Sequence, residues 1–262
     1  MSDFLSFSIC APLASWGEIA VGEVRDSLDR PTRSAVLGLL AGALGVDRAD
    51  DAAQVALERG YGVAVRALET GAPMRDYHTT QTAPAAAVKR HRPATRRELL
   101  SCVAPETPET IVSTRTYRQG SLSVIVLWAR PGDAARWSLA ELATALRAPH
   151  FVPYAGRKAN ALGLPTGAEV IAAESLAAAM QASEGRLVER LQMLADMGAG
   201  WLRRRAAWSL EVHHDHLEAD GIAAGALDNR VSMTRRDGVA DRGRWQFSER
   251  RVHVSQLRTE GK

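Results

Sequence analysis

The alternation of apolar and polar residues along the chain predicts several β-strands. Residues 4–10 and 61–68 alternate at every second position, which is the pattern of strands with one buried face. Residues 74–80 follow a turn and are predicted to return as the partner strand of residues 61–68. Residues 122–128 are apolar almost throughout, and such a run predicts a central strand of the sheet.

Three further segments have strand-like sequences. Residues 110–118 are followed by Gln119 and Gly120, which predicts a strand that enters a hairpin turn. Residues 208–213 alternate in the same way. Residues 252–257 are predicted to form a last strand at the edge of the sheet.

Apolar residues at spacings of three and four predict a first helix within residues 30–45. Pro31 suits the first turn, because the N–H that proline lacks has no intrahelical partner there. Thr32 or Asp29 can accept from the next free N–H groups, and Gly45 suits a left-handed end of the helix. The small residues of this segment would let a sheet approach the helix closely.

Other helices are predicted from their end signals. Residues 50–59 begin with a capping aspartate, and Ser138 opens a capping box for a helix over residues 138–147. Residues 169–195 are rich in alanine, leucine and methionine, which favours a helix with a break at residues 183–185.

The order of these elements predicts an α+β fold in which helices cover an antiparallel, ferredoxin-like (RRM-like) sheet. Residues 1–80 and 120–165 would form this layer, and residues 81–119 a hairpin-like arm inserted in it. Residues 166–262 would form a smaller C-terminal region that contains helix and strand. Because many RNA-binding proteins and many enzymes share this fold, it does not determine the function.

The composition is that of an ordinary soluble globular protein, since 46% of the 262 residues are apolar and 24% are charged. The net charge of +3 excludes neither a nucleic acid nor an acidic protein as partner. Cys10 and Cys102 lie far apart, which argues against a disulfide framework or a zinc site. The longest apolar run, 35–46, is too short to span a bilayer and no secretory signal is evident, so we expect a cytoplasmic protein without membrane contact.

The arm over residues 81–119 concentrates positive charge. Its prolines break regular structure, and a hydrophobic core cannot accommodate so many unpaired charges. The segment is therefore either a disordered loop or an arm that meets something anionic. Its clustered cations, with no acid among them, are Lys89, Arg90, Arg92, Arg96 and Arg97.

Two other segments combine cations with backbone N–H groups. At the start of the first helix, Arg30 and Arg33 converge with free N–H groups and the positive end of the helix dipole, where an anion could bind. The alternative is a core helix with solvated arginines at its start. In the loop over residues 149–165, Arg157 and Lys158 lie beside a glycine whose surrounding N–H groups make a phosphate nest plausible.

A cluster of histidines raises the question of a metal site. His213, His214 and His216 surround Asp215, but no fourth ligand is evident and the HExxH pattern is absent. A polar strand end is therefore favoured, and no metal is expected. The sequence contains no P-loop, nucleophile elbow or dinucleotide fingerprint, so no cofactor is expected either.

A second cluster consists of Tyr77 and His78 followed by Thr79, Thr80 and Gln81. Tyrosine and histidine could supply a general base and acid for metal-independent RNA cleavage. The favoured alternative is that these side chains form hydrogen bonds with a ligand or with the base of the arm.

Four segments, taken in order, resemble one known family. Residues 11–17, 30–45, 76–81 and 149–165 are similar to the CasD family of the repeat-associated mysterious protein (RAMP) superfamily. These are the subunits that hold the 5′ handle of the guide RNA in type I-E CRISPR Cascade complexes. The resemblance implies a ferredoxin-like palm and a protruding β-hairpin thumb, which the arm would form. It also implies a non-catalytic RNA-binding role in antiviral defence, because another subunit cuts the precursor RNA in this subtype.

The resemblance also implies partners and contacts. The partners would be the guide RNA, the backbone subunit and the large subunit that reads the protospacer-adjacent motif, with target DNA reached only through the ribonucleoprotein complex. The thumb cations named above would meet the guide or the backbone subunit. The remaining contacts would be phosphates bound by Arg30, Arg33, Ser34, Arg157 and Lys158, and handle nucleotides contacted by Tyr77, His78, Thr79 and Gln81.

Two alternatives stay open. The first is a metal-independent repeat-RNA endonuclease, as in a relative from another subtype, with Tyr77, His78 or Lys89 in the acid–base roles. The second is a ferredoxin-like enzyme whose basic loop binds a small phosphorylated substrate.

Overall fold

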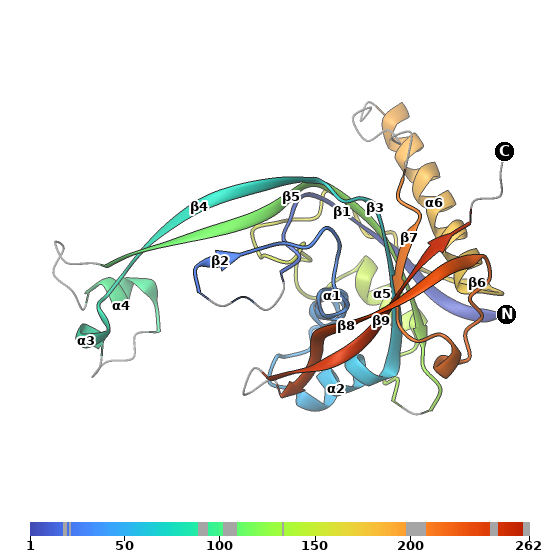
Figure 1. The fold of residues 1–262 in the computed structure, drawn as a ribbon, viewed down its shortest axis with the longest axis horizontal. Coiled ribbons are helices and arrows are strands. Elements are labelled where there is room, and N and C mark those ends of the chain that lie inside the picture. The colour runs from blue at the N-terminus through green and yellow to red at the C-terminus, as the bar shows by residue number, and fades with distance from the viewer. Residues whose placement is uncertain are drawn as a thin grey trace.

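The computed structural model describes residues 1–17, 20, 22–88, 94–101, 109–132, 134–197, 208–241 and 246–258 of the chain. Within these residues, nine strands form one sheet whose main order is β6-β1-β5-β3-β7-β9-β8, while β2 and β4 pair with β5. Figure 1 shows α1 beneath this sheet and α6 on its opposite side. The fold is therefore a mixed α and β structure built on a large, mainly antiparallel sheet.

The strands are β1 (Ser2–Ala14), β2 (Val24–Arg25), β3 (Tyr61–Glu69), β4 (Ala72–Thr82), β5 (Glu109–Ala129), β6 (Glu169–Ala173), β7 (Glu211–His214), β8 (Leu227–Asp241) and β9 (Gln246–Leu257). The helices are α1 (Arg33–Leu44), α2 (Asp51–Gly60), α3 (Ala85–Val88), α4 (Arg96–Ser101), α5 (Leu139–Arg147) and α6 (Leu176–Asp196), with a short 3₁₀ turn, η2 (Glu218–Asp220). Among the described residues, no helix has the length and apolar character needed to cross a membrane.

The central strand β5 is buried on both faces, as its apolar sequence predicts. Ile125 and Leu127 pack with α1 and α5, whereas Val126 and Trp128 pack with α6 on the other face. Since successive residues of a strand point to opposite faces, one apolar run supplies both layers of the core. Burying a large apolar side chain stabilises the fold by about 1.5–3 kcal/mol, so this strand anchors both layers.

The ends of the first helix follow their local sequence. Thr32 is the N-cap, with its hydroxyl 3.1 Å from the N–H of Ala35, and Gly45 ends the helix with a φ of 72°. The helix begins at Arg33, so Pro31 precedes the cap and does not occupy the first turn. The predicted capping box at Ser138 is present at the start of α5.

The pairing of β4 differs from the sequence prediction. It pairs with the first half of β5, from Ala72 opposite Gln119 to Thr82 opposite Glu109, and not with β3. Both edges of β3 are already occupied, by β5 and β7. Gly120 has the expected positive φ of 73°, but β5 continues through it instead of turning back.

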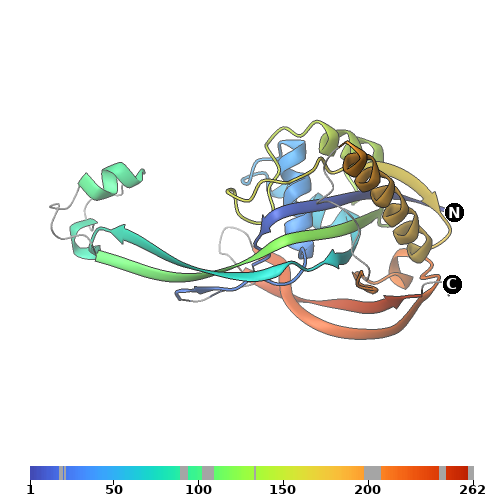
Figure 2. The ribbon, with the colours of Figure 1, turned by 90° about the horizontal axis from the view of Figure 1, so that it is seen from above.

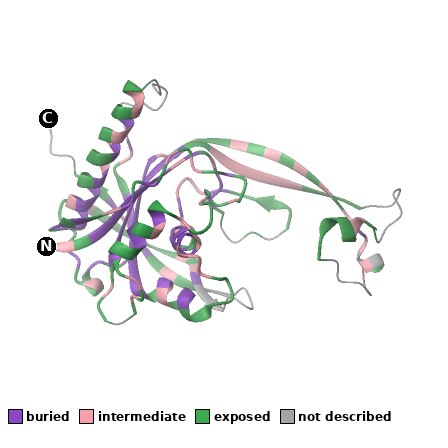
Figure 3. Ribbon diagram, turned by 180° about the vertical axis from the view of Figure 1, so that it is seen from behind, coloured by how far each residue is buried: buried purple, intermediate pink, exposed green. Residues whose placement is uncertain are grey.

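Together, residues 72–82 and 109–119 form a ribbon of two paired strands, called the β4–β5 ribbon below, and the short strand β2 also pairs with it at residues 114–115. Figures 1 and 2 show it extending away from the rest of the sheet, with α3 and α4 at its far end. Figure 3 shows that its residues are intermediate or exposed, unlike the buried strands of the main sheet. Lys89, Arg90 and Arg92 of the predicted arm lie outside the described residues.

Two predictions for the C-terminal part were wrong. Residues 169–173 form β6, which pairs with β1, and α6 then runs without a break through residues 183–185. The Ser183 hydroxyl donates to the carbonyl of Ala179 at 2.7 Å within the helix and lies 2.6 Å from the Ser6 hydroxyl of β1. The strand β9 lies between β7 and β8, so it is internal and β8 forms the edge.

The continuity of α6 predicts the effect of a substitution at Gly185. This glycine lies inside the helix, and nothing lies within 4 Å of the position that a Cβ would take. Gly185→Ala should therefore raise the free energy of unfolding by about 0.5–1 kcal/mol, because alanine loses less backbone entropy in a helix. Urea denaturation would measure the change. Gly221→Ala is the control: its surroundings are equally open but its φ is 69°, so stability should fall.

Candidate nucleic-acid interface

A groove of about 1020 Å³ lies along α1, between the end of β1 and the loop over residues 149–165. We call it the α1 groove. It brings together predicted contact residues from two distant segments: Ser34 from the first turn of α1, and Arg157 and Lys158 from the loop. Of the residues that the structure describes, three cations and one carboxylate line the groove: Arg25, Arg157, Lys158 and Asp26.

The floor of the groove is formed by the small residues of α1. Gly38 and Gly42 line it, and nothing lies within 4 Å of the position of a Cβ on either residue. The prediction that small residues let a sheet approach is therefore wrong for these two glycines. They leave open space on the helix face that is turned away from the sheet.

The loop over residues 149–165 is fixed to the end of β1. Gly156 has a φ of 82°, and a Cβ on it would lie 1.8 Å from the Ser15 carbonyl oxygen. The Ser15 N–H donates to the carbonyl of Ala155 at 3.1 Å, and the Asn160 side chain donates to the same carbonyl at 3.2 Å. Only glycine allows this close approach of two backbones.

Two further hydrogen bonds engage amides that the predicted nest around Gly156 would need. The N–H of Gly156 donates to the carbonyl of Tyr154 at 3.2 Å, and the N–H of Ala155 donates to the backbone carbonyl of Asn160 at 2.8 Å. These amides serve the loop itself. The loop also places the side chains of Arg157 and Lys158 at the groove.

Aromatic and apolar side chains form one wall of the groove, which the sequence analysis did not identify. Phe151, Val152 and Tyr154 line the groove and are 54%, 81% and 44% exposed. The sequence did contain a signal for this wall: large apolar residues occur on a proline-rich loop. Such a loop has no core of its own in which to bury them, so they are expected to be exposed. Exposed rings beside cations suit bases that stack while phosphates pair with the charges.

Arg33 occupies a different environment from the one predicted for it. Its Nε lies 2.9 Å from the Asp215 carboxylate, its Nη1 lies 2.7 Å from Glu58, and its side chain is only 5% exposed. Burial acts to lower the pKa of this guanidinium, but the charges of Asp215 and Glu58 outweigh it and raise the pKa. Arg33 is thus an ion-paired core residue, and its expected contact with phosphate was wrong.

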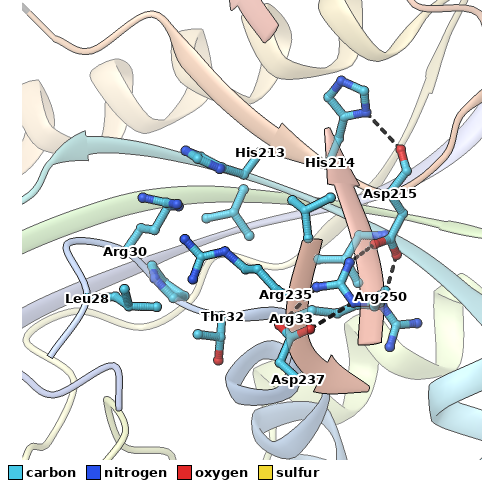
Figure 4. Close-up of a pocket in the computed structure, with 14 residues that line it drawn as sticks. Leu28, Arg30, Thr32, Arg33, His213, His214, Asp215, Arg235, Asp237 and Arg250 are labelled. Atoms are coloured by element: carbon cyan, nitrogen blue, oxygen red, sulfur yellow. Dashed lines mark hydrogen bonds and ion pairs between the residues drawn. The ribbon is translucent and has the colours of Figure 1, made fainter. Parts of the chain in front are cut away.

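Arg30 lies near Arg33 beside a small cavity of about 30 Å³, shown in Figure 4. Its side chain is 12% exposed and forms an ion pair with Asp29. Burial, together with the charge of Arg235, lowers the pKa of Arg30 although Asp29 acts to raise it. The positive charges at the start of α1 are therefore compensated within the protein.

Asp215 is the centre of this buried cluster. Besides Arg33, its carboxylate accepts from Arg130 at 3.0 Å, from Arg250 at 2.6 Å and from the N–H of Val63 at 3.1 Å. The neighbouring His214 forms hydrogen bonds with the Asp215 carbonyl and the Ser255 hydroxyl. Within the described part of the chain, no group of three or more potential metal ligands is arranged to hold an ion.

The residues predicted around Tyr77 lie on β4, outside the groove. Tyr77, Thr79 and Gln81 share one face of the ribbon, because every second residue of a strand points the same way, and Tyr77 is 75% exposed. His78 points to the opposite face, with its Nδ1 4.0 Å from Asp76. Arg96 lies with Arg97 on α4 at the far end of the ribbon, and both are exposed.

Comparison with known proteins identifies similar chains. The model of the family described as "CRISPR-associated protein (Cas_Cas5)" matches residues 4–253. The "CRISPR system Cascade subunit CasD" of Escherichia coli (strain K12) is 30% identical over 175 residues, which cover 63% of this chain and 70% of that protein.

Two solved structures share the fold. A chain of a "CRISPR RNA-guided surveillance complex" matches with a TM-score of 0.57 at 22% identity, covering 97% of this chain and 90% of that one. A "Cas protein" crystal structure matches with a TM-score of 0.56 at 20% identity, covering 97% of this chain and 94% of the other.

The close approach at Gly156 predicts a large cost for a side chain there. Gly156→Ala should lower the free energy of unfolding by more than the roughly 1–2 kcal/mol of a left-handed alanine, because the methyl group also meets the Ser15 carbonyl. Gly132→Ala is the matched control, with a φ of 94° and open space around it. Equal losses for both variants in urea denaturation would contradict the proposed contact between the loop and β1.

The burial of His213 predicts acid sensitivity. Burial and the charge of Arg30 lower its pKa to about 4, although Glu211 acts in the opposite direction. The unfolded chain therefore binds more protons than the folded one between about pH 6.5 and pH 4, and stability falls as the pH is lowered through this window. One pKa unit is worth about 1.4 kcal/mol, so a shift from 6.5 to about 4 sets an upper limit of roughly 3–4 kcal/mol on the loss.

Urea denaturation at a series of pH values measures this loss. His213→Gln cannot take up the proton, so its stability should depend less steeply on pH than that of the wild type. Parallel curves for the two proteins across the window would show that His213 is not responsible.

Proposed function

Since the chain belongs to the Cas5 family of CRISPR-associated proteins, we propose that it is a non-catalytic RNA-binding subunit of a type I-E Cascade complex that holds the 5′ handle of the guide RNA. The observation that carries this proposal is the α1 groove, where Arg157 and Lys158 lie beside the exposed wall of Phe151, Val152 and Tyr154. Single-stranded RNA is the ligand that combines phosphates for the cations with unstacked bases for the rings.

The distribution of ion pairs supports this choice of groove. The arginines at the start of α1 are neutralised by Asp29, Asp215 and Glu58. Neither Arg157 nor Lys158 forms an ion pair within the described residues. A phosphate that approaches the groove therefore meets charge that the protein has not already compensated.

We propose that the β4–β5 ribbon is the thumb and that the sheet covered by α1 and α5 is a ferredoxin-like palm. A ribbon of two strands is only marginally stable by itself, and this one exposes Tyr77, Ile111 and Val112. These side chains would be buried against the guide or the backbone subunit in the complex, with Arg96 and Arg97 at the tip meeting phosphate. The large subunit would be a further partner, target DNA would be reached only through the complex, and the complex would act in the cytoplasm.

The geometry of β4 argues against the endonuclease alternative. A general acid and a general base must both reach the same scissile phosphate. Tyr77 and His78 are adjacent in a strand, so their side chains leave opposite faces of the ribbon. Lys89, the remaining candidate, lies outside the described residues.

RNA binding tests the proposal. We expect the full chain to bind single-stranded RNA that carries the repeat-derived 5′ handle, and Lys158→Ala to weaken the affinity by about tenfold, the loss of one charge-assisted contact. The slope of log affinity against log salt should become shallower by about 0.7 for the phosphate contact that is lost. Fluorescence anisotropy over a salt series measures both quantities.

Arg136→Ala removes an exposed cation that stacks on Trp137 and does not line the groove, so it should change neither quantity. The RNA should stay intact in EDTA. A discrete cleavage product that His78→Ala abolishes would overturn the non-catalytic role in favour of the endonuclease.

A further inference from the structure

We propose that Tyr117 is a positioning residue that holds Arg157 for a backbone phosphate where the guide strand passes from the α1 groove to the β4–β5 ribbon. This inference rests on the proposed function, because it names one contact of the same RNA. It concerns Tyr117, a residue of β5 that does not itself line the groove.

The two residues meet at the root of the ribbon. Tyr117 lies on β5, opposite Met74 of β4 and one residue beyond the last pair that β5 makes with β1, Ala14 with Arg118. Beyond this point β5 no longer pairs with β1 and continues outward with β4 and, at residues 114–115, with the short strand β2. The guanidinium carbon of Arg157, which comes from the loop of the groove, lies 4.4 Å from the centre of the Tyr117 ring.

The ring fixes the guanidinium without neutralising it. Arg33 is held by carboxylates, which orient the side chain but also cancel its charge. A tyrosine ring attracts a cation through its quadrupole and leaves the full positive charge in place. Arg157 is thus oriented before any ligand arrives, which lowers the entropy that ordering this side chain costs on binding.

The hydrogen bonding of Arg157 points to a missing acceptor. Its Nη1 is buried and has no hydrogen-bond partner among the residues that the structure describes, whereas the guanidinium groups of Arg33 and Arg250 donate to carboxylates. A buried donor without an acceptor is costly, and the cost is removed when an acceptor arrives. A phosphate oxygen at the root of the ribbon would supply that acceptor and the compensating charge together, once the side chains that cover this nitrogen shift to admit it.

The chemistry of the contact distinguishes three substitutions. Tyr117→Phe keeps the ring and its negative face, so the position of Arg157 should be unchanged. Tyr117→Leu keeps an apolar side chain but removes the ring. Arg157→Lys keeps the charge but loses the planar group that stacks and presents several donors in one plane.

The test measures binding of the full chain to fluorescein-labelled single-stranded RNA with the repeat-derived 5′ handle, by anisotropy over a salt series. Tyr117→Phe should bind within twofold of the wild type. Tyr117→Leu should weaken binding by about threefold, the range of one partly exposed cation–π contact. The double variant that combines Tyr117→Leu with Arg157→Lys should bind RNA no more weakly than Arg157→Lys alone, because the ring acts only through the arginine.

Arg136→Lys is the matched control, because Arg136 also stacks on a ring, with its guanidinium carbon 5.0 Å from the centre of Trp137, and it does not line the groove. Its affinity should not change. Thermal unfolding of each variant identifies any that does not fold. If Tyr117→Leu does not fold, Arg157→Lys, which lies on a surface loop, tests the contact between Tyr117 and Arg157 instead.

The outcomes separate the two proposals. If the wild type binds the handle RNA but Tyr117→Leu binds equally well, or Tyr117→Phe is as weak as Tyr117→Leu, the positioning role is wrong and the RNA-binding function stands. Losses that add fully in the double variant would also overturn the positioning role. If the wild type shows no salt-dependent affinity for the RNA, both proposals fail.

Discussion

The carboxylate of Asp215 is the contact on which the arrangement of this molecule depends. It receives the side chains of Arg33, Arg130 and Arg250 and the N–H of Val63, and so joins α1, the end of β5, β9 and β3 at one buried point. A buried carboxylate is tolerated only when it is paired and hydrogen-bonded in this way, and removing it would leave several cations without their partner. The start of α1 therefore has one position relative to the sheet.

That position decides which face of α1 meets solvent. With Arg33 turned inward to Asp215, Ser34, Gly38 and Gly42 line the open side of the helix. The loop fixed by Gly156 to the end of β1 forms the opposite wall. The interior thus contains arginines that are compensated by acids, whereas Arg157 and Lys158 in the groove form no ion pair with any residue that the structure describes. This contrast supports an external polyanion as the ligand of the groove.

Local elements could be predicted where short-range physics decides them. The cap at Thr32, the left-handed Gly45, the capping box at Ser138 and the doubly buried run of β5 were all evident from neighbouring residues. The pairing of β4 with β5 was not, because alternation shows that a segment is a strand and says nothing about its neighbour. The break expected at residues 183–185 failed because tertiary packing overrides weak helix propensity.

The sequence by itself determined the chemistry available: a cationic chain with a first helix that has arginines at its start, and a rigid basic loop. It also carried the resemblance to the Cascade subunits, which the family match bears out. Only the tertiary structure decided which charges are free to bind. Arg33 and Arg157 are both arginines with another cation nearby in the sequence. In the structure, Arg33 faces Asp215 in the core, whereas Arg157 faces an aromatic ring beside the groove. The compensation of Arg33 depends on Glu58 and Asp215, which are distant in the chain, so no local pattern can reveal it.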